Sequence, residues 1–131
     1  MLISALIAQG PPSRVLEEAI DGRFELVLPD AVLDELEQVL ELKLGFGSER
    51  IRSSRQLLEG IAVATLGRPR TTESVTGDPA DDLVLAAAIE AHADVLVTGD
   101  RRHLLPVGEH RGVRILTAQA FLAELQEAEH R

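Results

Sequence analysis

No cysteine, tryptophan or tyrosine occurs in the sequence, and its 131 residues include only three phenylalanines. The absence of cysteine excludes disulfides, thiolate catalysis and cysteine zinc sites, a pattern expected of a cytoplasmic protein. With so few aromatic rings, base stacking is not expected as a main mode of nucleic-acid binding. The chain has 22 acidic and 13 basic side chains, so its formal charge of −9 argues against a broad nucleic-acid-binding surface.

Long hydrophobic runs are also missing. No segment approaches the roughly 18 apolar residues of a membrane span, and no basic segment precedes the apolar start, so neither a membrane association nor a signal peptide is expected. The hydrophobic content of 45% is nevertheless that of a folded protein. The length predicts one domain, residues 1–131, with a core of its own.

Helical and strand patterns alternate along the chain. Helices are expected at residues 11–22, 30–45, 48–60, 80–92 and 118–131. Strands are expected at residues 23–29, 61–66, 93–100 and 113–116, with a loop at 68–79. Such alternation predicts an α/β domain around a mostly parallel sheet with right-handed crossovers.

Four acidic residues are candidates for a functional site. Glu35 lies on the border of the apolar arc of its helix, about 40° from Val39, whereas Asp34, Glu37 and Glu41 lie opposite that arc. A boundary glutamate that reaches water explains Glu35 equally well.

The other three, Asp81, Asp82 and Asp100, lie around the later apolar helix and strand. Asp82 projects toward the interior from a helix that is apolar almost all round. Asp78 and Asp81 fit helix capping better than a site. Asp100 comes directly after residues 94–99, at the exit of the strand expected at 93–100, where parallel α/β sheets bind ligands. A turn aspartate is the alternative. Asp94 lies at the opposite, entry end of that strand and reads as a turn residue.

Carboxylates brought together without a cation would repel one another and take up protons. An all-oxygen cluster suits Mg²⁺ or Mn²⁺, which can activate a water for attack on a phosphodiester. No histidine has metal-ligand spacing; the four are His92, His103, His110 and His130.

Taken together, residues 2–40, 78–105 and 113–122 resemble the PIN-domain family, in the branch described as toxins of toxin–antitoxin systems. The resemblance implies a three-layer α/β/α domain and a metal-dependent ribonuclease using Mg²⁺ or Mn²⁺. Glu35, Asp82 and Asp100 match the family's acidic ligands and catalytic residues. Thr98 matches a threonine that often lines the site, and Asp81 is a supporting candidate.

The family usually begins with a strand ending in Asp-Thr-Asn, and Met1 stands where the following stretch begins. The first strand and its aspartate are therefore expected to be missing. The sheet would then close the gap, borrow a strand or expose an edge, unless residues 2–7 fill the slot instead of starting a helix. A non-catalytic PIN-like binding module is the alternative function.

Expected partners are an RNA substrate, a small antitoxin protein and a second copy of the chain. RNA would be bound by a local arginine patch, since arginines cluster in two places: Arg50, Arg52 and Arg55, and then Arg101 and Arg102. Exposed arginines on solvated faces are the alternative. A haloacid-dehalogenase-type phosphatase is disfavoured, because its Asp-x-Asp-x-Thr nucleophile motif does not occur.

Overall fold

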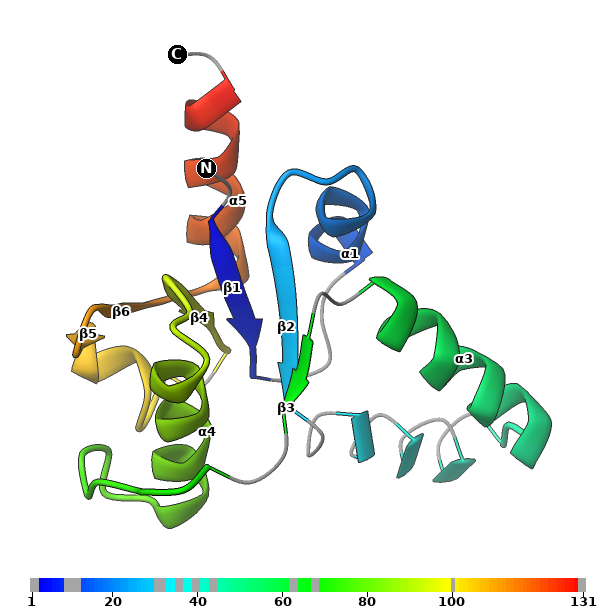
Figure 1. Ribbon diagram of the computed structural model, residues 1–131, viewed down its shortest axis with the longest axis horizontal. Coiled ribbons are helices and arrows are strands. Elements are labelled where there is room, and N and C mark those ends of the chain that lie inside the picture. The colour runs from blue at the N-terminus through cyan, green and yellow to red at the C-terminus, as the bar shows by residue number, and fades with distance from the viewer. Residues whose placement is uncertain are drawn as a thin grey trace.

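A six-stranded sheet in the order β3-β2-β1-β4-β6-β5 organises the computed structural model of the chain (Figure 1). The structure describes residues 3–8, 13–29, 33–34, 37–38, 41–42, 45–61, 64–66, 69–99 and 101–129. Its strands are β1 (Ser4–Ile7), β2 (Glu25–Pro29), β3 (Ala64–Leu66), β4 (Val95–Val97), β5 (Glu109–His110) and β6 (Val113–Leu116). Its helices are α1 (Ser13–Ile20), α3 (Ser48–Ile61), α4 (Pro79–Glu90), α5 (Ala118–Glu129) and the short 3₁₀ helix η1 (Leu105–Val107). Residues 33–34, 37–38 and 41–42 are also helical.

The sheet is parallel except at one edge. β1 pairs in parallel with β2 and β4, β2 pairs with β3, and β4 pairs with β6. β5 is antiparallel to β6. The mostly parallel sheet predicted from the alternation of patterns is confirmed.

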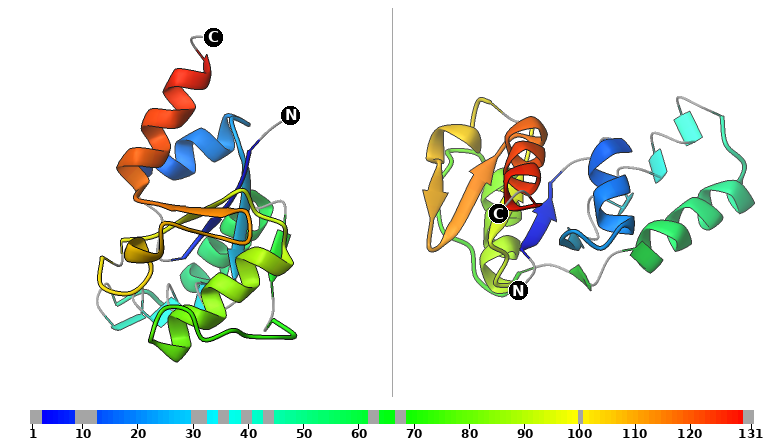
Figure 2. Two further views of the ribbon diagram at one scale, coloured as in Figure 1. Left: turned by 90° about the vertical axis from the view of Figure 1, so that its left-hand side faces the viewer. Right: turned by 90° about the horizontal axis from the view of Figure 1, so that it is seen from above.

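Two apolar layers flank the sheet, because successive strand residues point to opposite faces. Ala5 and Ile7 pack with Val15 of α1 and Phe121 of α5, where the Phe24 and Phe121 rings meet edge to face at 4.9 Å. Leu6 and Leu96 pack on the other face with residues of α4. Figure 2 shows α1 and α5 on one side of the strands and α4 on the other, which is the expected three-layer α/β/α arrangement.

Residues 4–7 fill the central slot of the sheet, which is the alternative that the sequence left open to a vacant slot. Ser4–Ile7 forms β1 in the middle of the sheet, with Leu6 in register with Val27 on one side and Leu96 on the other. Residues 4–8 are apolar after Ser4, as a strand covered on both faces requires. The first helix consequently begins later, at Ser13.

Asp94 is indeed a turn residue at the amino end of β4, and it also anchors β1. The Ser4 amide donates to Asp94 Oδ2 at 2.9 Å, and the Asp94 amide donates to the Ser4 carbonyl at 2.8 Å. These bonds fix the start of β1 against β4.

The remaining predictions of elements hold, with bounds that differ by a few residues. The predicted helices at 11–22, 48–60, 80–92 and 118–131 correspond to α1, α3, α4 and α5, and the four predicted strands to β2, β3, β4 and β6. β5 and η1 were not predicted. Within the described residues, no helix combines the length and the apolar character needed to cross a membrane.

Candidate acidic site

The strand order reverses between β1 and β4, which marks the place where a ligand is expected. Neighbouring strands are β2 and then β3 on the side of β1, and β6 and then β5 on the side of β4. In open parallel sheets, the crevice beyond the carboxyl ends of two such strands is the usual binding position. Here that edge follows Ile7 of β1 and Val97 of β4.

Thr98 lies at this edge, directly after β4. It is 3% exposed, and its amide donates to the Leu116 carbonyl of β6 at 3.0 Å. The structure thus places Thr98 at the carboxyl end of the strand, as the sequence predicts. Glu35 and Asp100, two of the three predicted ligands, lie outside the described residues.

Three aspartates lie at the start of α4. The end of α4 leads directly into the amino end of β4, so the start of α4 lies toward the carboxyl edge of the sheet. Asp78 is the N-cap: its Oδ2 accepts from the Asp81 amide at 3.0 Å, and Pro79 occupies the first turn. Gly77 has a φ of +87°, a left-handed conformation that suits glycine and turns the chain into the helix. The capping explanation is therefore correct for Asp78.

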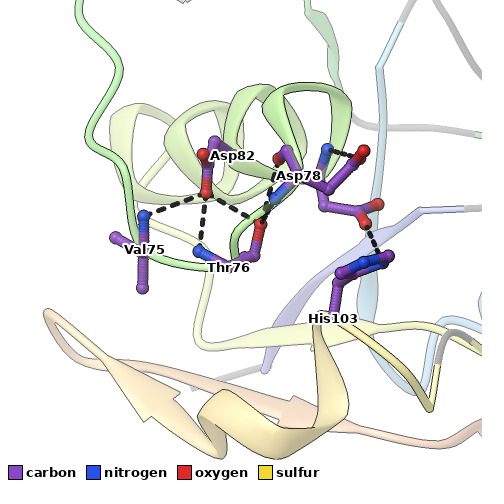
Figure 3. Close-up of polar contacts among 6 residues, drawn as sticks. Val75, Thr76, Asp78, Asp82 and His103 are labelled. Atoms are coloured by element: carbon purple, nitrogen blue, oxygen red, sulfur yellow. Dashed lines mark hydrogen bonds and ion pairs between the residues drawn. The ribbon is translucent and has the colours of Figure 1, made fainter.

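Asp82 is buried, 7% exposed, on the side of Ala86 and Ile89 that the helical spacing predicts. Its Oδ1 accepts from the amides of Val75 and Thr76, at 3.0 and 2.8 Å, and from the Thr76 hydroxyl at 2.8 Å (Figure 3). The Thr76 and Val75 amides lower the pKa of Asp82 against the opposing effect of burial, so the carboxylate is ionised at neutral pH. One of its oxygens is thus already bound by three donors of the chain itself.

Asp81 points in a different direction from the same turn of helix. Its Oδ2 lies 3.2 Å from Nδ1 of His103, in the turn that follows Asp100 in sequence. The Asp81 side chain is 21% exposed and the His103 side chain 35% exposed, so the pair remains accessible to solvent. This contact ties the acidic start of α4 to the segment that leaves β4.

Sequence reasoning treated Asp81 as only a supporting candidate and His103 as a loop residue. The available signal was position: His103 follows Asp100 by three residues, at the edge where the ligand crevice is expected. Helical periodicity alone could not show that Asp81, rather than Asp82, faces this turn.

The chemistry of these groups fits a hard divalent cation. Carboxylate and hydroxyl oxygens are the donors that Mg²⁺ and Mn²⁺ prefer, and the chain offers no sulfur ligand except one methionine. Within the described ranges, no three histidine, aspartate or glutamate side chains gather closely enough to hold one ion. A complete ligand set would therefore have to include residues outside the described ranges, where Glu35 and Asp100 are the predicted ligands.

The arginines proposed to bind RNA are in different environments. Arg55 is engaged by three carboxylates: Nη1 lies 2.9 Å from Asp34 and 3.0 Å from Glu37, and Nε lies 3.1 Å from Glu59. These hydrogen bonds raise the pKa of Arg55. Arg50 stacks on the Phe46 ring at 3.9 Å. The other candidates, Arg52, Arg101 and Arg102, are exposed.

The fold and the acidic edge together define the class of the protein: a three-layer α/β domain with carboxylates at the carboxyl end of a parallel sheet. The family described as PIN domain matches residues 1–102. The chain therefore belongs to the PIN-domain family, whose members are typically nucleases and generally use divalent metal ions. A search of curated proteins gives no match.

Proposed function

We propose that the protein is a Mg²⁺- or Mn²⁺-dependent endoribonuclease that hydrolyses RNA phosphodiesters in the cytoplasm, as the toxin of a toxin–antitoxin pair. The observation that supports this most directly is the Asp81–His103 contact beside the end of β4, within a chain of the PIN-domain family. It brings an acidic helix start to the turn that follows Asp100. A small antitoxin protein and a second copy of the chain are the protein partners that this function suggests.

The proposed ligands are Glu35, Asp100 and the aspartates of α4. Of the latter, Asp81 is the better candidate, because Asp82 Oδ1 already accepts three hydrogen bonds. A bound divalent ion would supply an activated water and neutralise charge that develops on the phosphate.

The chain's own residues would orient the reacting groups. Nδ1 of His103 can donate to Asp81 and so hold this carboxylate in one orientation. Arg101 and Arg102, both exposed and next to Asp100 in sequence, can attract the RNA backbone to this edge.

Calorimetric titration with Mn²⁺ tests the metal site. We expect weak binding of Mn²⁺, weaker binding in Asp100→Asn, and no tight structural Zn²⁺, since the proposed ligands include neither cysteine nor a histidine pair. A wild-type protein that binds no Mn²⁺, or an Asp100→Asn variant that binds it unchanged, would contradict the proposed site.

The second candidate function is a non-catalytic PIN-like binding module. A specific feature favours it: the central strand Ser4–Ile7 carries no carboxylate, where the family resemblance implies an aspartate. A binding module would retain affinity for a protein partner while cleaving no RNA with either metal.

Arg55 and Arg52 provide a matched test of the proposed RNA surface. Arg55→Ala should lower the free energy of unfolding by about 1–2 kcal/mol, because three carboxylates lose their shared partner in a partly exposed network. Arg52→Ala should leave stability nearly unchanged but weaken RNA binding. The slope of the logarithm of the binding constant against the logarithm of the salt concentration should become smaller in magnitude by about one. Urea unfolding and RNA titrations at several salt concentrations measure both. RNA binding that is independent of salt would refute the arginine patch.

A further inference from the structure

We propose that Asp82 and Thr76 are positioning residues, which hold the start of α4 so that the carboxylate of Asp81 faces the turn after β4. The inference rests on the proposed function in assigning Asp81 to the acidic site. It assigns a different task to Asp82, which the sequence suggested as a ligand.

Three residues, Thr76, Asp78 and Asp82, form a closed chain of hydrogen bonds (Figure 3), and the Asp81 amide is joined to this chain through Asp78. The Thr76 hydroxyl lies 2.8 Å from Asp82 Oδ1 and accepts from the Asp78 amide at 3.1 Å. Asp78 Oδ2 then accepts from the Asp81 amide, and the Asp78 carbonyl accepts from the Asp82 amide at 2.9 Å. Because each residue restrains the next, displacing Thr76 should displace Asp81.

The hydroxyl of Thr76 is the group on which this arrangement depends. It has a single proton, and the Asp82 carboxylate is a stronger acceptor than the Asp78 carbonyl, which lies 3.0 Å away. Donation to Asp82 leaves a lone pair of the hydroxyl directed at the Asp78 amide. Thr76 therefore links the buried carboxylate to the helix cap.

Asp82 is suited to anchoring because it is ionised and 93% covered, with donors that converge on one oxygen. A buried charge without such donors would be costly. The segment that supplies them, residues 70–76, lies over a cavity of about 280 Å³ beside Leu85, Ala86 and Ile89 of α4. Asp82 thus fixes one end of this segment to the helix.

Residues 70–76 are also held at a second point, through the side chain of Glu73. Glu73 accepts from Arg111 Nη2 at 2.9 Å and lies 3.3 Å from Nε2 of His110, next to the edge strand β5. Arg111 and then His110 lower the pKa of Glu73 to about 2, so this carboxylate is ionised as well. Glu73 provides a control, since it restrains the segment without contributing a side chain to the closed chain.

Hydrogen exchange of backbone amides, measured by NMR on the full chain, is the direct test. In Thr76→Val, the Asp81 amide should exchange about tenfold faster or more, because its acceptor Asp78 loses the link that the Thr76 hydroxyl makes to the Asp82 carboxylate. Thr76→Ser restores the hydroxyl and should restore slow exchange. Glu73→Gln should leave the Asp81 amide protected from exchange, even if it lowers the melting temperature as much as Thr76→Val does.

A titration with Mn²⁺ gives a second readout. Losing the orientation of a ligand typically weakens metal binding 10- to 100-fold, so Thr76→Val should weaken Mn²⁺ binding by about that factor, while Glu73→Gln should not. Unchanged exchange at Asp81 in Thr76→Val, or equal changes in Glu73→Gln, would overturn the positioning role. A wild type that binds no Mn²⁺ would instead refute the proposed function, and the exchange data would still decide the positioning.

Discussion

Replacing Leu6 with alanine should lower the free energy of unfolding by about 2–5 kcal/mol. Leu6 is fully buried at the centre of the sheet, between Val27 of β2 and Leu96 of β4, and it packs toward α4. Its loss would leave a cavity that the two neighbouring strands cannot close easily. Equilibrium urea unfolding followed by circular dichroism measures the change.

Leu42→Ala is the matched control, because Leu42 is 81% exposed and loses the same atoms. It should change stability by no more than about 0.5 kcal/mol. Equal effects of the two substitutions would mean that residues 4–7 do not form the central strand in solution. The comparison is informative because the family resemblance assigned these residues to the first helix.

Short apolar segments explain why the centre of the sheet was not predicted. Residues 2–8 are apolar apart from Ser4, and Gln9 follows. Such a short apolar run shows neither the alternation of a half-exposed strand nor the spacing of an amphipathic helix, so its pattern fits a buried strand and the first turn of a helix equally well. The decision comes from tertiary pairing: β1 forms parallel ladders with both β2 and β4. The pattern of seven residues does not predict this pairing, because the partner strands come from distant parts of the sequence.

Elements with strong local signals were predicted well. The helix α4 has an N-cap aspartate, a proline in its first turn and an apolar body, and the structure places it where those signals indicate. The strand β4 is buried throughout, as its run of apolar residues predicts. In contrast, β5 is only two residues long and depends on its antiparallel partner β6.

In the acidic site, too, local patterns predicted part of the structure, and contacts between separate segments determined the rest. Helical spacing correctly predicted that Asp82 is buried, but the donors that meet its carboxylate come from Val75 and Thr76, in a loop without periodicity. The contact of Asp81 with His103 joins residues on opposite sides of β4 in sequence. The different roles of Asp81 and Asp82 therefore follow from the three-dimensional structure and not from the sequence pattern.

The largest functional effect is expected from Asp81→Asn, which should reduce Mn²⁺-dependent RNA cleavage by roughly 100-fold or more. The substitution keeps the size of the side chain but removes the charge that would attract a metal ion, and a metal's charge stabilisation contributes several kcal/mol to such reactions. Initial rates of cleavage of a fluorescent RNA, at saturating Mn²⁺ and with EDTA as the blank, measure the loss.

Asp21→Asn is the control for this experiment, because Asp21 is an exposed aspartate in the turn after α1 and its substitution changes the net charge equally. It should cleave RNA at the wild-type rate. Full activity in Asp81→Asn would remove Asp81 from the site. If the wild type itself cleaves no RNA with Mn²⁺ or Mg²⁺ but still binds a protein partner, the binding-module function is the correct one, since the fold would then be retained without the chemistry.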